Sequence, residues 1–324
     1  MCRLMKPSIS MLLFLLAAVL SASLIQAQVA LPRIIPGAPR ILNTRFPIEV
    51  GNTIIPENPA ALQWGGPSRF GGGEIAGVSS HAVTQLEGDI SGRFAGFRLV
   101  GETVALAGET IDISLESNFG FPVEKSAATL AFSFSWPESY AFGYSATSSE
   151  LNETSLSGTT SAEFEKKLFG VSWRMSDSWY IGAAAGTEEA TLSLSSSSQN
   201  LKRDIFMSGI GFRHTGGVIW HMELSMTKSD AFEDQTGALS SGHLIRQGVL
   251  EAAFWNLVFG YTSFNLKGSG TRADETIEGF TLDFGYAPFS GFTVTGRFER
   301  STYEASGFQV AIEETNALIV TLQF

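Results

Sequence analysis

The carboxyl-terminal segment ALIVTLQF, residues 317–324, alternates two kinds of side chain along its length. Leu318, Val320, Leu322 and Phe324 recur at every second position, and smaller or polar residues stand between them. Successive side chains of a β-strand point to opposite faces, so this segment is predicted to be a strand with one apolar face. Either a protein core or a lipid bilayer can cover such a face, and the remaining sequence distinguishes between the two.

The amino terminus predicts export. Arg3 and Lys6 precede an apolar run over residues 11–20, and small residues follow, with Ala27 as the expected last residue removed. This arrangement is typical of a cleaved signal peptide, residues 1–27, because the run is well short of the roughly 20 residues that span a bilayer as a helix. No later stretch is long enough and uncharged, so a membrane-bound mature chain would have to cross with strands.

The composition favours a lipid-facing barrel. The chain has 25 Phe and 34 Gly but only 16% charged residues, which is unusual for a soluble protein of this size. A secreted soluble β-sandwich or β-helix is the alternative, but it does not need so many outward aromatic residues. Cys2 is the only cysteine and leaves with the signal peptide, so no disulfide is expected. The net charge of −11 argues against nucleic acid as a partner.

From Ser68 onward the chain consists of apolar-alternating segments that are joined in turn by tight and by longer polar connections. This alternation is typical of short periplasmic turns and long external loops in a transmembrane antiparallel β-barrel. The tight turns are expected near 136–138, 176–178, 214–217, 255–256 and 288–291. The longer loops are expected over 148–160, 195–204, 229–242, 267–276 and 305–309.

The strand count predicted in this way is about fourteen, and an even count places both termini on the periplasmic side. Eleven strands are expected near 126–136, 138–148, 160–175, 179–194, 204–214, 217–228, 245–254, 256–267, 277–287, 291–304 and 310–324. Segments that begin at Arg69, Arg93 and Ile111 supply three more, the second being read as one strand, RFAGFRLVGETVAL. A barrel of about twelve strands is the alternative, if the two most amino-terminal segments stay outside the sheet.

The alternation also assigns faces. The side chains predicted to face lipid include Leu130, Phe132, Phe134, Trp136, Trp220, Met222, Leu224, Met226, Phe280, Leu282, Phe284 and Tyr286. Aromatic residues beside tight turns are expected to form a periplasmic girdle: Trp136, Trp179, Trp255 and Tyr286. The phase slips between Tyr261 and Phe264, which predicts a β-bulge near Thr262 and Ser263.

Charged residues of both signs are predicted on the lumenal face. The candidates are Arg98, Glu102, Asp112, Glu116, Arg174, Arg213, His221, Glu223, Glu251, Asp283, Arg297 and Glu299. A ring of one sign would have indicated an ion-selective pore. The mixture instead indicates ion pairs that hold the shape of the barrel, an unselective water-filled interior, or contacts to a substrate.

Residues 28–67 differ from the barrel region, 68–324, because they hold seven of the 11 prolines: Pro32, Pro36, Pro39, Pro47, Pro56, Pro59 and Pro67. Proline cannot donate to a strand ladder, so this segment is expected outside the sheet. It is predicted to be either a plug in the lumen or a periplasmic segment.

Two features resemble known families. The terminal strand that ends on Phe324 resembles the closing strand of outer-membrane β-barrels of Gram-negative bacteria, which implies that the barrel assembly machinery recognises this residue. The run Asn58-Pro59-Ala60-Ala61-Leu62, just before the first strand, resembles the Asn-Pro-Ala motif of the FadL-like transporters of long-chain fatty acids and aromatic hydrocarbons.

The FadL resemblance implies a fourteen-stranded barrel, an amino-terminal hatch, and Asn58, Pro59, Ala60 and Leu62 at the junction of the two. It implies passive uptake of a small hydrophobic ligand that binds from outside, without any cofactor, by a barrel whose other partner is the outer-membrane lipid. A simple Asx-Pro turn at the start of the barrel is the alternative interpretation of the motif. A structural or assembly barrel that anchors surface proteins, and a general porin, are the alternative functions.

An enzyme is not expected. His81, His214, His221 and His243 are scattered, and no spacing between them predicts a metal site. His221 and Glu223 would share a face of one strand, but no nucleophile accompanies them.

Overall fold

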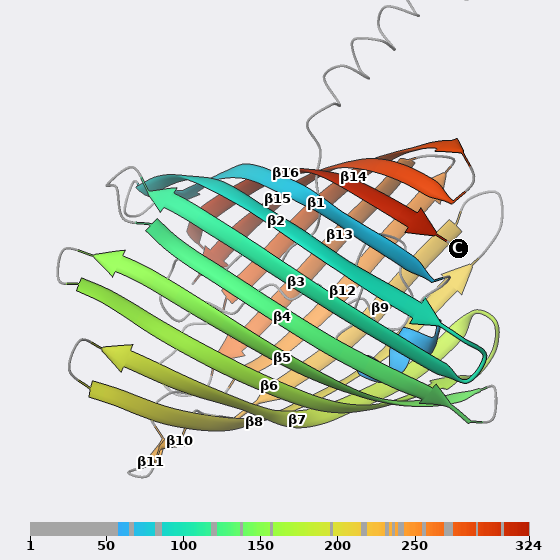
Figure 1. The fold of residues 1–324 in the computed structure, drawn as a ribbon, viewed down its shortest axis with the longest axis horizontal. Coiled ribbons are helices and arrows are strands. Elements are labelled where there is room, and N and C mark those ends of the chain that lie inside the picture. Colours follow the sequence, from blue (N-terminus) through green and yellow to red (C-terminus); the bar gives the residue numbers. More distant parts are fainter. Residues whose placement is uncertain are drawn as a thin grey trace, which may run out of the picture.

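The computed structural model describes a β-barrel (Figure 1). It describes residues 58–64, 68–81, 86–117, 122–136, 139–155, 158–194, 197–214, 219–230, 233–234, 237–238, 243–254, 257–268, 275–289, 291–305 and 308–323. The predicted signal peptide, the proline-rich segment up to residue 57, Trp255 and Phe324 lie outside these ranges. No helix within these ranges is long and apolar enough to cross a membrane.

Fourteen long strands form the wall, as the sequence predicts. Two two-residue strands, β10 (Glu233–Asp234) and β11 (Gly237–Ala238), form a pair, and β10 also pairs with β8 at Lys202. The long strands are β1 (Arg69–His81), β2 (Leu86–Val100), β3 (Val104–Ser117), β4 (Pro122–Ser135), β5 (Tyr140–Ser155), β6 (Gly158–Arg174), β7 (Trp179–Leu194), β8 (Ser197–His214), β9 (Ile219–Ser229), β12 (His243–Phe254), β13 (Leu257–Gly268), β14 (Glu275–Phe289), β15 (Phe292–Ala305) and β16 (Phe308–Gln323).

Every long strand pairs with two neighbours, and all pairs are antiparallel. The first and last strands are joined, from Arg69 opposite Gln323 to His81 opposite Ala311. At the other side of the wall β8 pairs with β9, from Ile205 opposite Ser229 to His214 opposite Trp220. The order of pairing therefore returns to its starting point, so that the sheet has no free long edge.

The end of the barrel where β16 finishes is called the proximal end below, and the opposite end the distal end. β4 and β6 also finish at the proximal end, and the turn 176–178 connects β6 to β7 there. Two backbone bonds close this turn, in which Trp179 O accepts from Met175 N at 2.9 Å and from Ser176 N at 3.4 Å. Gly291, in the proximal turn between β14 and β15, has a φ of 82°, which favours glycine.

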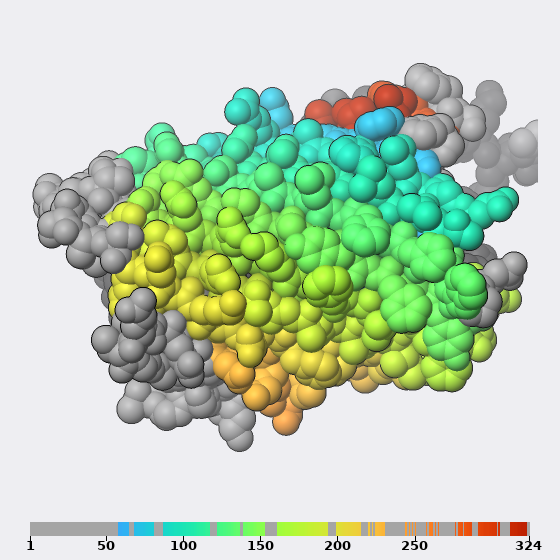
Figure 2. All heavy atoms as spheres, turned by 60° about the horizontal axis from the view of Figure 1, so that its bottom comes forward, coloured from blue at the N-terminus to red at the C-terminus, as the bar shows by residue number. Residues whose placement is uncertain are grey.

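The alternation predicted for the proximal half of the wall is confirmed. Leu130, Phe132 and Phe134 of β4 are exposed, while Ala131 and Ser133 between them are buried. In β16, Leu318, Val320 and Leu322 are likewise exposed, and the intervening residues are buried. Large ring-bearing side chains gather on the green part of the outer surface (Figure 2). An apolar exterior of this kind is what a transmembrane barrel presents to lipid.

Aromatic residues mark the proximal boundary of this apolar belt. Trp136, Trp179 and Tyr286 of the predicted girdle are exposed on the outer face, at 66%, 39% and 59%. Tyr140 and Trp173 join them as a stacked pair, with ring centroids 5.9 Å apart and planes 7° from parallel. Aromatic rings of this kind favour the interface between lipid and water.

Charged residues mark the distal boundary of the belt. The count starts from an aromatic residue at the proximal end of each strand: Trp220 on β9, Tyr286 on β14 and Phe292 on β15. On each strand the first charged residue of the outward face lies eight positions away. The residues at this level form what we call the charged ring: Asp204, Lys228, Arg246, Glu278, Arg300 and Glu314. Eight residues at about 3.3 Å each, on strands tilted by about 40°, give the belt a height of roughly 20 Å, close to that of other barrels of this class.

One of the predicted strands is wrong in its bounds. The segment read as one strand from Arg93 contains a tight turn over residues 101–103, where Gly101 N donates to Val104 O at 2.8 Å. Its first half belongs to β2 and its second half to β3. The count of fourteen strands still holds. The segment IDISLES, which was counted as a strand of its own, is part of β3, and the segment from Arg93 is divided between β2 and β3.

The predicted bulge near Thr262 and Ser263 is also wrong. β13 pairs with β12 and with β14 in continuous register through both residues. Register shifts occur instead between Tyr286 and Phe289 of β14 and between Tyr303 and Glu304 of β15. Both lie near strand ends, where a change of register disturbs fewer backbone bonds.

Several predicted external loops are parts of strands. Residues 148–160 belong mostly to the β5–β6 hairpin, which stays paired up to Ser155 opposite Gly158. Residues 195–204 belong mostly to the β7–β8 hairpin, which stays paired up to Leu194 opposite Ser197. These segments are polar because their outer face lies beyond the apolar belt, and polarity alone does not distinguish such a strand from a loop.

Candidate functional site: a segment seated inside the barrel

The Asn-Pro-Ala run begins a short helix inside the barrel. Asn58 precedes the 3-10 helix η1 (Pro59–Trp64), and its side-chain Oδ1 accepts a hydrogen bond from Ala60 N at 3.0 Å. Its backbone carbonyl accepts from Ala61 N at 2.9 Å. Asparagine caps the backbone donors in this way, and proline suits the first helical position because its missing N–H would have no partner there.

The run is also held by the barrel wall. Asn58 Nδ2 donates to the backbone carbonyl of Val171 in β6 at 3.1 Å. Asn58, Ala60, Ala61 and Leu62 are completely buried. The helix contacts β3, β4, β5, β6 and β7, so it lies against one side of the lumen (Figure 1). The structure thus places Asn58, Pro59, Ala60 and Leu62 against the inner face of the wall.

Two wall glycines make room for this run. Gly143 of β5 and Gly170 of β6 lie directly opposite each other. A Cβ added to Gly143 would lie 2.4 Å from the Pro59 carbonyl carbon, and one added to Gly170 would lie 1.9 Å from Asn58 Oδ1. Both distances are far below van der Waals contact, so side chains at these positions would displace the run. A glycine within a strand often marks such a close approach, but nothing in the sequence relates these two glycines to Asn58.

The far end of the helix is held by polar contacts. Trp64 Nε1 donates to Ser172 Oγ at 2.8 Å, and the Arg174 guanidinium lies 5.8 Å from the centroid of the Trp64 ring system. Gln63 Nε2 donates to the backbone carbonyl of Gly101 at 2.9 Å. Between these ends, Leu62 packs against Ala105, Ala107 and Ala131, three small residues of the inner wall.

Asp283 and Arg297 are an internal ion pair, as one reading of the sequence expected. Arg297 Nε donates to Asp283 Oδ1 at 2.5 Å, and Arg297 Nη2 donates to Asp283 Oδ2. Their exposures are only 2% and 1%. Two parallel bonds compensate both charges for the loss of water. Arg98 is also fully buried and faces inward from β2.

Arg174 and Arg213 lie at the proximal mouth. Arg174 Nη2 contacts Asp177 Oδ1 at 3.2 Å, and its side chain is 40% exposed. Arg213 is partly buried, and its backbone N donates to Ser178 O at 2.8 Å. His221 of β9 lies opposite Arg213 and also opposite Glu251 of β12, but the side chains of His221, Glu223 and Glu251 lie outside the described part.

For three residues the predicted lumenal position is wrong. Glu102 is exposed in the turn between β2 and β3. Asp112 and Glu116 are exposed on the outer face of β3, where Asp112 Oδ2 accepts from Arg93 Nε at 3.1 Å. The prediction assumed that apolar residues face outward along the whole strand, and in this half of β3 the apolar residues face inward.

The apolar inner wall is the feature that the sequence interpretation missed. Buried apolar residues form three inward-facing clusters. Their members are Ile75, Phe94, Ala317 and Ile319; Leu168, Ala184, Ile205 and Met207; and Ile90, Ile113 and Leu115. The interior of a transmembrane barrel is usually polar, so these clusters form an unusual apolar surface within the barrel. The alternation of IDISLES indicated that one face of this strand is apolar. The charged face was predicted to line the lumen, whereas the apolar face lies there.

Comparison of the sequence with known families and with curated proteins gives no match. Comparison of the fold with solved structures does give matches. The structure of the "CymD monoaromatic hydrocarbon channel" superposes with a TM-score of 0.57 at 11% identity, covering 83% of this chain and 91% of that one. The Ralstonia pickettii "toluene transporter TbuX" gives 0.54 at 11% identity, with coverages of 86% and 95%.

A Pseudomonas aeruginosa FadL homologue gives a TM-score of 0.50 at 8% identity, covering 82% of this chain and 93% of that one. At such identities the likeness concerns the fold. These structures match over most of their own length. The chain has the fourteen-stranded barrel fold of the FadL-type transporters.

Proposed function

We propose that this protein is an outer-membrane barrel through which small hydrophobic compounds pass inward, without any chemical step. The observation that carries the proposal is the apolar inner wall, in which Ile75, Phe94, Ile113, Leu115 and Leu168 are each less than 10% exposed. A water-filled pore does not require an apolar wall. An apolar ligand that binds to such a wall is stabilised by a free energy of about 25 cal/mol for each Å² of apolar surface that it buries. Support also comes from the likeness of the fold to CymD, a monoaromatic hydrocarbon channel, and to TbuX, a toluene transporter.

In this proposal residues 28–67 are the hatch, residues 68–324 the barrel, and residues 1–27 a removed signal peptide. The seating of η1 against β3–β7 supports the hatch, because the helix lies inside the lumen near the proximal end. The compound would bind to the apolar inner wall from the distal side and would leave after the hatch shifts. Phe324 would be the residue that the assembly machinery recognises.

The route through the lumen is tested with two neighbouring residues that point to opposite faces. Ile113→Asn puts a polar group on the inner wall and should lower the uptake of labelled toluene or of a labelled long-chain fatty acid by about tenfold. Asp112→Asn changes the outer face of the same strand and should leave uptake unchanged. Equal uptake by both variants and the wild type would rule out a route along this wall and would favour an anchoring or assembly barrel.

The hatch is tested by ion conductance in planar bilayers. Gly170→Val should displace the Asn58 run, because even a Cβ there would lie 1.9 Å from Asn58 Oδ1. We expect the wild type to be nearly silent and both Gly170→Val and a chain without residues 28–67 to conduct. Gly248→Ala is the matched control, since its added Cβ would have only Leu224 Cδ2 nearby, at 3.7 Å. If all four proteins conduct alike, the segment closes nothing and a general porin is the better description.

A further inference from the structure

The basic residues on the distal outer surface are almost all paired with carboxylates. The pairs are Arg93 with Asp112 at 3.1 Å, Lys167 with Glu165 at 2.9 Å, Lys202 with Glu189 at 2.9 Å, Lys228 with Asp230 at 3.0 Å, and Arg300 with Glu314 at 3.2 Å. Arg246, in β12, is exposed on the same surface and has no carboxylate partner among the residues that the structure describes. Among the outward basic residues that the structure describes there, Arg246 is therefore the one whose charge is available to a ligand.

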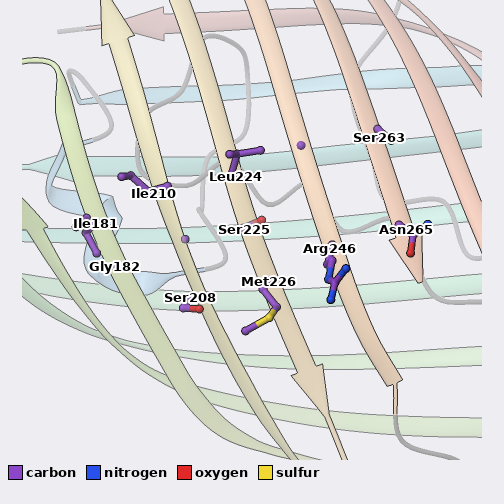
Figure 3. A pocket seen from close by; sticks show the side chains of 12 residues that line it. Ile181, Gly182, Ser208, Ile210, Leu224, Ser225, Met226, Arg246, Ser263 and Asn265 are labelled. Atoms are coloured by element: carbon purple, nitrogen blue, oxygen red, sulfur yellow. The ribbon is translucent and has the colours of Figure 1, made fainter. Parts of the chain in front are cut away.

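Arg246 stands at the rim of a furrow in the outer wall. The furrow has a volume of about 670 Å³ and crosses β7, β8, β9, β12 and β13 (Figure 3). Its lining includes Ile210, Leu224, Met226 and Gly248, with Arg246 and Asn265 on neighbouring strands directly opposite each other. The furrow thus combines an apolar floor with a cation and an amide.

Gly248 keeps the floor of the furrow open. It lies two residues from Arg246 on the same outward face, and an added Cβ would have only Leu224 Cδ2 nearby, at 3.7 Å. Gly248 lies opposite Leu224 of β9 and Ser263 of β13, so the missing side chain leaves a depression between two strands. A flexible hydrocarbon chain can fill a depression of this shape.

The height of Arg246 identifies the kind of molecule that it meets. It belongs to the charged ring, eight residues from the proximal end of β12 at Phe254, roughly 20 Å along the barrel axis. A lipid-facing arginine at the middle of a bilayer costs about 2–4 kcal/mol, but this cost falls to about 0–1 kcal/mol at the interface. At that level a guanidinium meets lipid headgroups, and it pairs with phosphate through two parallel hydrogen bonds.

We propose that the furrow binds a phosphate-bearing acyl lipid of the outer leaflet, with the phosphate on Arg246 and an acyl chain over Gly248 and Leu224. Asn265 lies opposite Arg246 and supplies a further hydrogen-bonding group. The furrow faces away from the lumen, so this site is separate from the proposed route of uptake and would exist in a barrel that transports nothing.

The test is native mass spectrometry of the full-length folded barrel in detergent, with hexa-acylated lipid A added. Arg246→Gln should lower lipid retention by about tenfold, as expected for the loss of a charge-assisted bond. Gly248→Leu should lower retention by blocking the floor. Arg300→Gln, at the same level but next to Glu314, and Ala128→Leu, with nearly the same added bulk at an exposed position of β4, should retain lipid as the wild type does.

Two further probes distinguish the source of the phosphate. The wild type should retain dephosphorylated lipid A about as poorly as Arg246→Gln retains intact lipid A. Inorganic phosphate alone should not remain bound to the wild type. Equal retention of lipid A by Arg246→Gln and the wild type, or equal retention of the dephosphorylated lipid, would overturn the proposal. Retention of inorganic phosphate by itself would assign Arg246 to a simple anion site and would also overturn it. Heat-dependent gel migration confirms that each variant is a folded barrel.

Discussion

The proximal and distal halves of the barrel wall arrange the same kinds of residue in opposite ways. On β3, Val104 and Leu106 face outward in the proximal half, whereas Ile113 and Leu115 face inward in the distal half. On β2, Leu99 faces outward and Arg98 inward near the proximal end, and further along Arg93 faces outward and Phe94 inward. The environment of the two faces therefore differs between the two halves of one strand, although the geometry of the strand stays the same.

The change of environment explains the reversal. In the proximal half lipid covers the outside, so apolar side chains are favoured there and the polar groups lie inside. Beyond the charged ring the outside is polar, and the outward residues of β5–β8 are mostly Ser, Glu, Lys, Thr and Asn. Apolar residues in that half are buried on the inner face instead. Strand alternation thus predicts that two faces differ, but the solvent on each side decides which face is apolar.

The largest expected effect concerns the polar interior of the proximal half. Asp283→Ala leaves the Arg297 guanidinium buried without its carboxylate, so the free energy of unfolding should fall by about 3–5 kcal/mol. The measurement is the urea midpoint of the barrel in lipid vesicles. Asp283→Leu combined with Arg297→Met should recover most of this loss. A loss below about 1 kcal/mol for the single variant would show that water reaches the pair.

A second prediction compares the outer faces of the two halves on one strand. Phe132→Arg in β4 places a charge within the apolar belt and should destabilise the barrel by about 2–4 kcal/mol. Ser126→Arg, on the same face but in the distal half, should cost at most about 1 kcal/mol. The same urea titration measures both. Similar costs for the two variants would contradict the distal boundary assigned to the belt.

A third prediction concerns the inner face of the distal half. Ile113 is only 4% exposed, so Ile113→Ala should cost about 2 kcal/mol. Leu130→Ala removes similar bulk from the outer face of the proximal half, where the side chain is 63% exposed and where lipid fills the space. Its effect on the urea midpoint should be smaller. The reverse ranking would mean that the distal inner face is open to water.

The smallest effect is expected on the outer face of the distal half. Arg93 and Asp112 form an ion pair at 3.1 Å with side chains 79% and 54% exposed. Exposed pairs of this kind contribute about 0–1 kcal/mol, and salt screens them further. Arg93→Gln should therefore leave the midpoint nearly unchanged in 0.15 M salt, by the same assay. A loss as large as that of Asp283→Ala would place this pair within a buried contact.

The sequence alone was sufficient for the strand count and for the outward face of the belt. Residues such as Phe132, Phe134 and Leu322 recur with a period of two, and only their alternation is needed to assign them. The short turns were also predictable where they contain turn-forming residues, as at 176–178. The turn over 101–103 was missed because Val100 and Val104 on either side make the segment read as one continuous apolar strand.

The candidate site was predictable only in part. Asn58, Pro59, Ala60 and Leu62 were singled out as candidates because their order and position resemble a known motif. Their partners Gly143, Gly170 and Ser172 are more than 80 residues away, and no local pattern predicts which wall positions meet the run. Arg246 was not singled out either, because its meaning depends on which other charges on the outer surface have partners.

The sequence by itself determined that the chain forms a barrel of about fourteen strands, because side-chain alternation and turn chemistry are local properties of the backbone. Only the tertiary structure decided where the belt ends, which face of each distal half-strand is apolar, and where the Asn58 run is seated. Those properties depend on what lies beside each strand once the sheet closes, and neighbours brought together by closure are far apart along the chain.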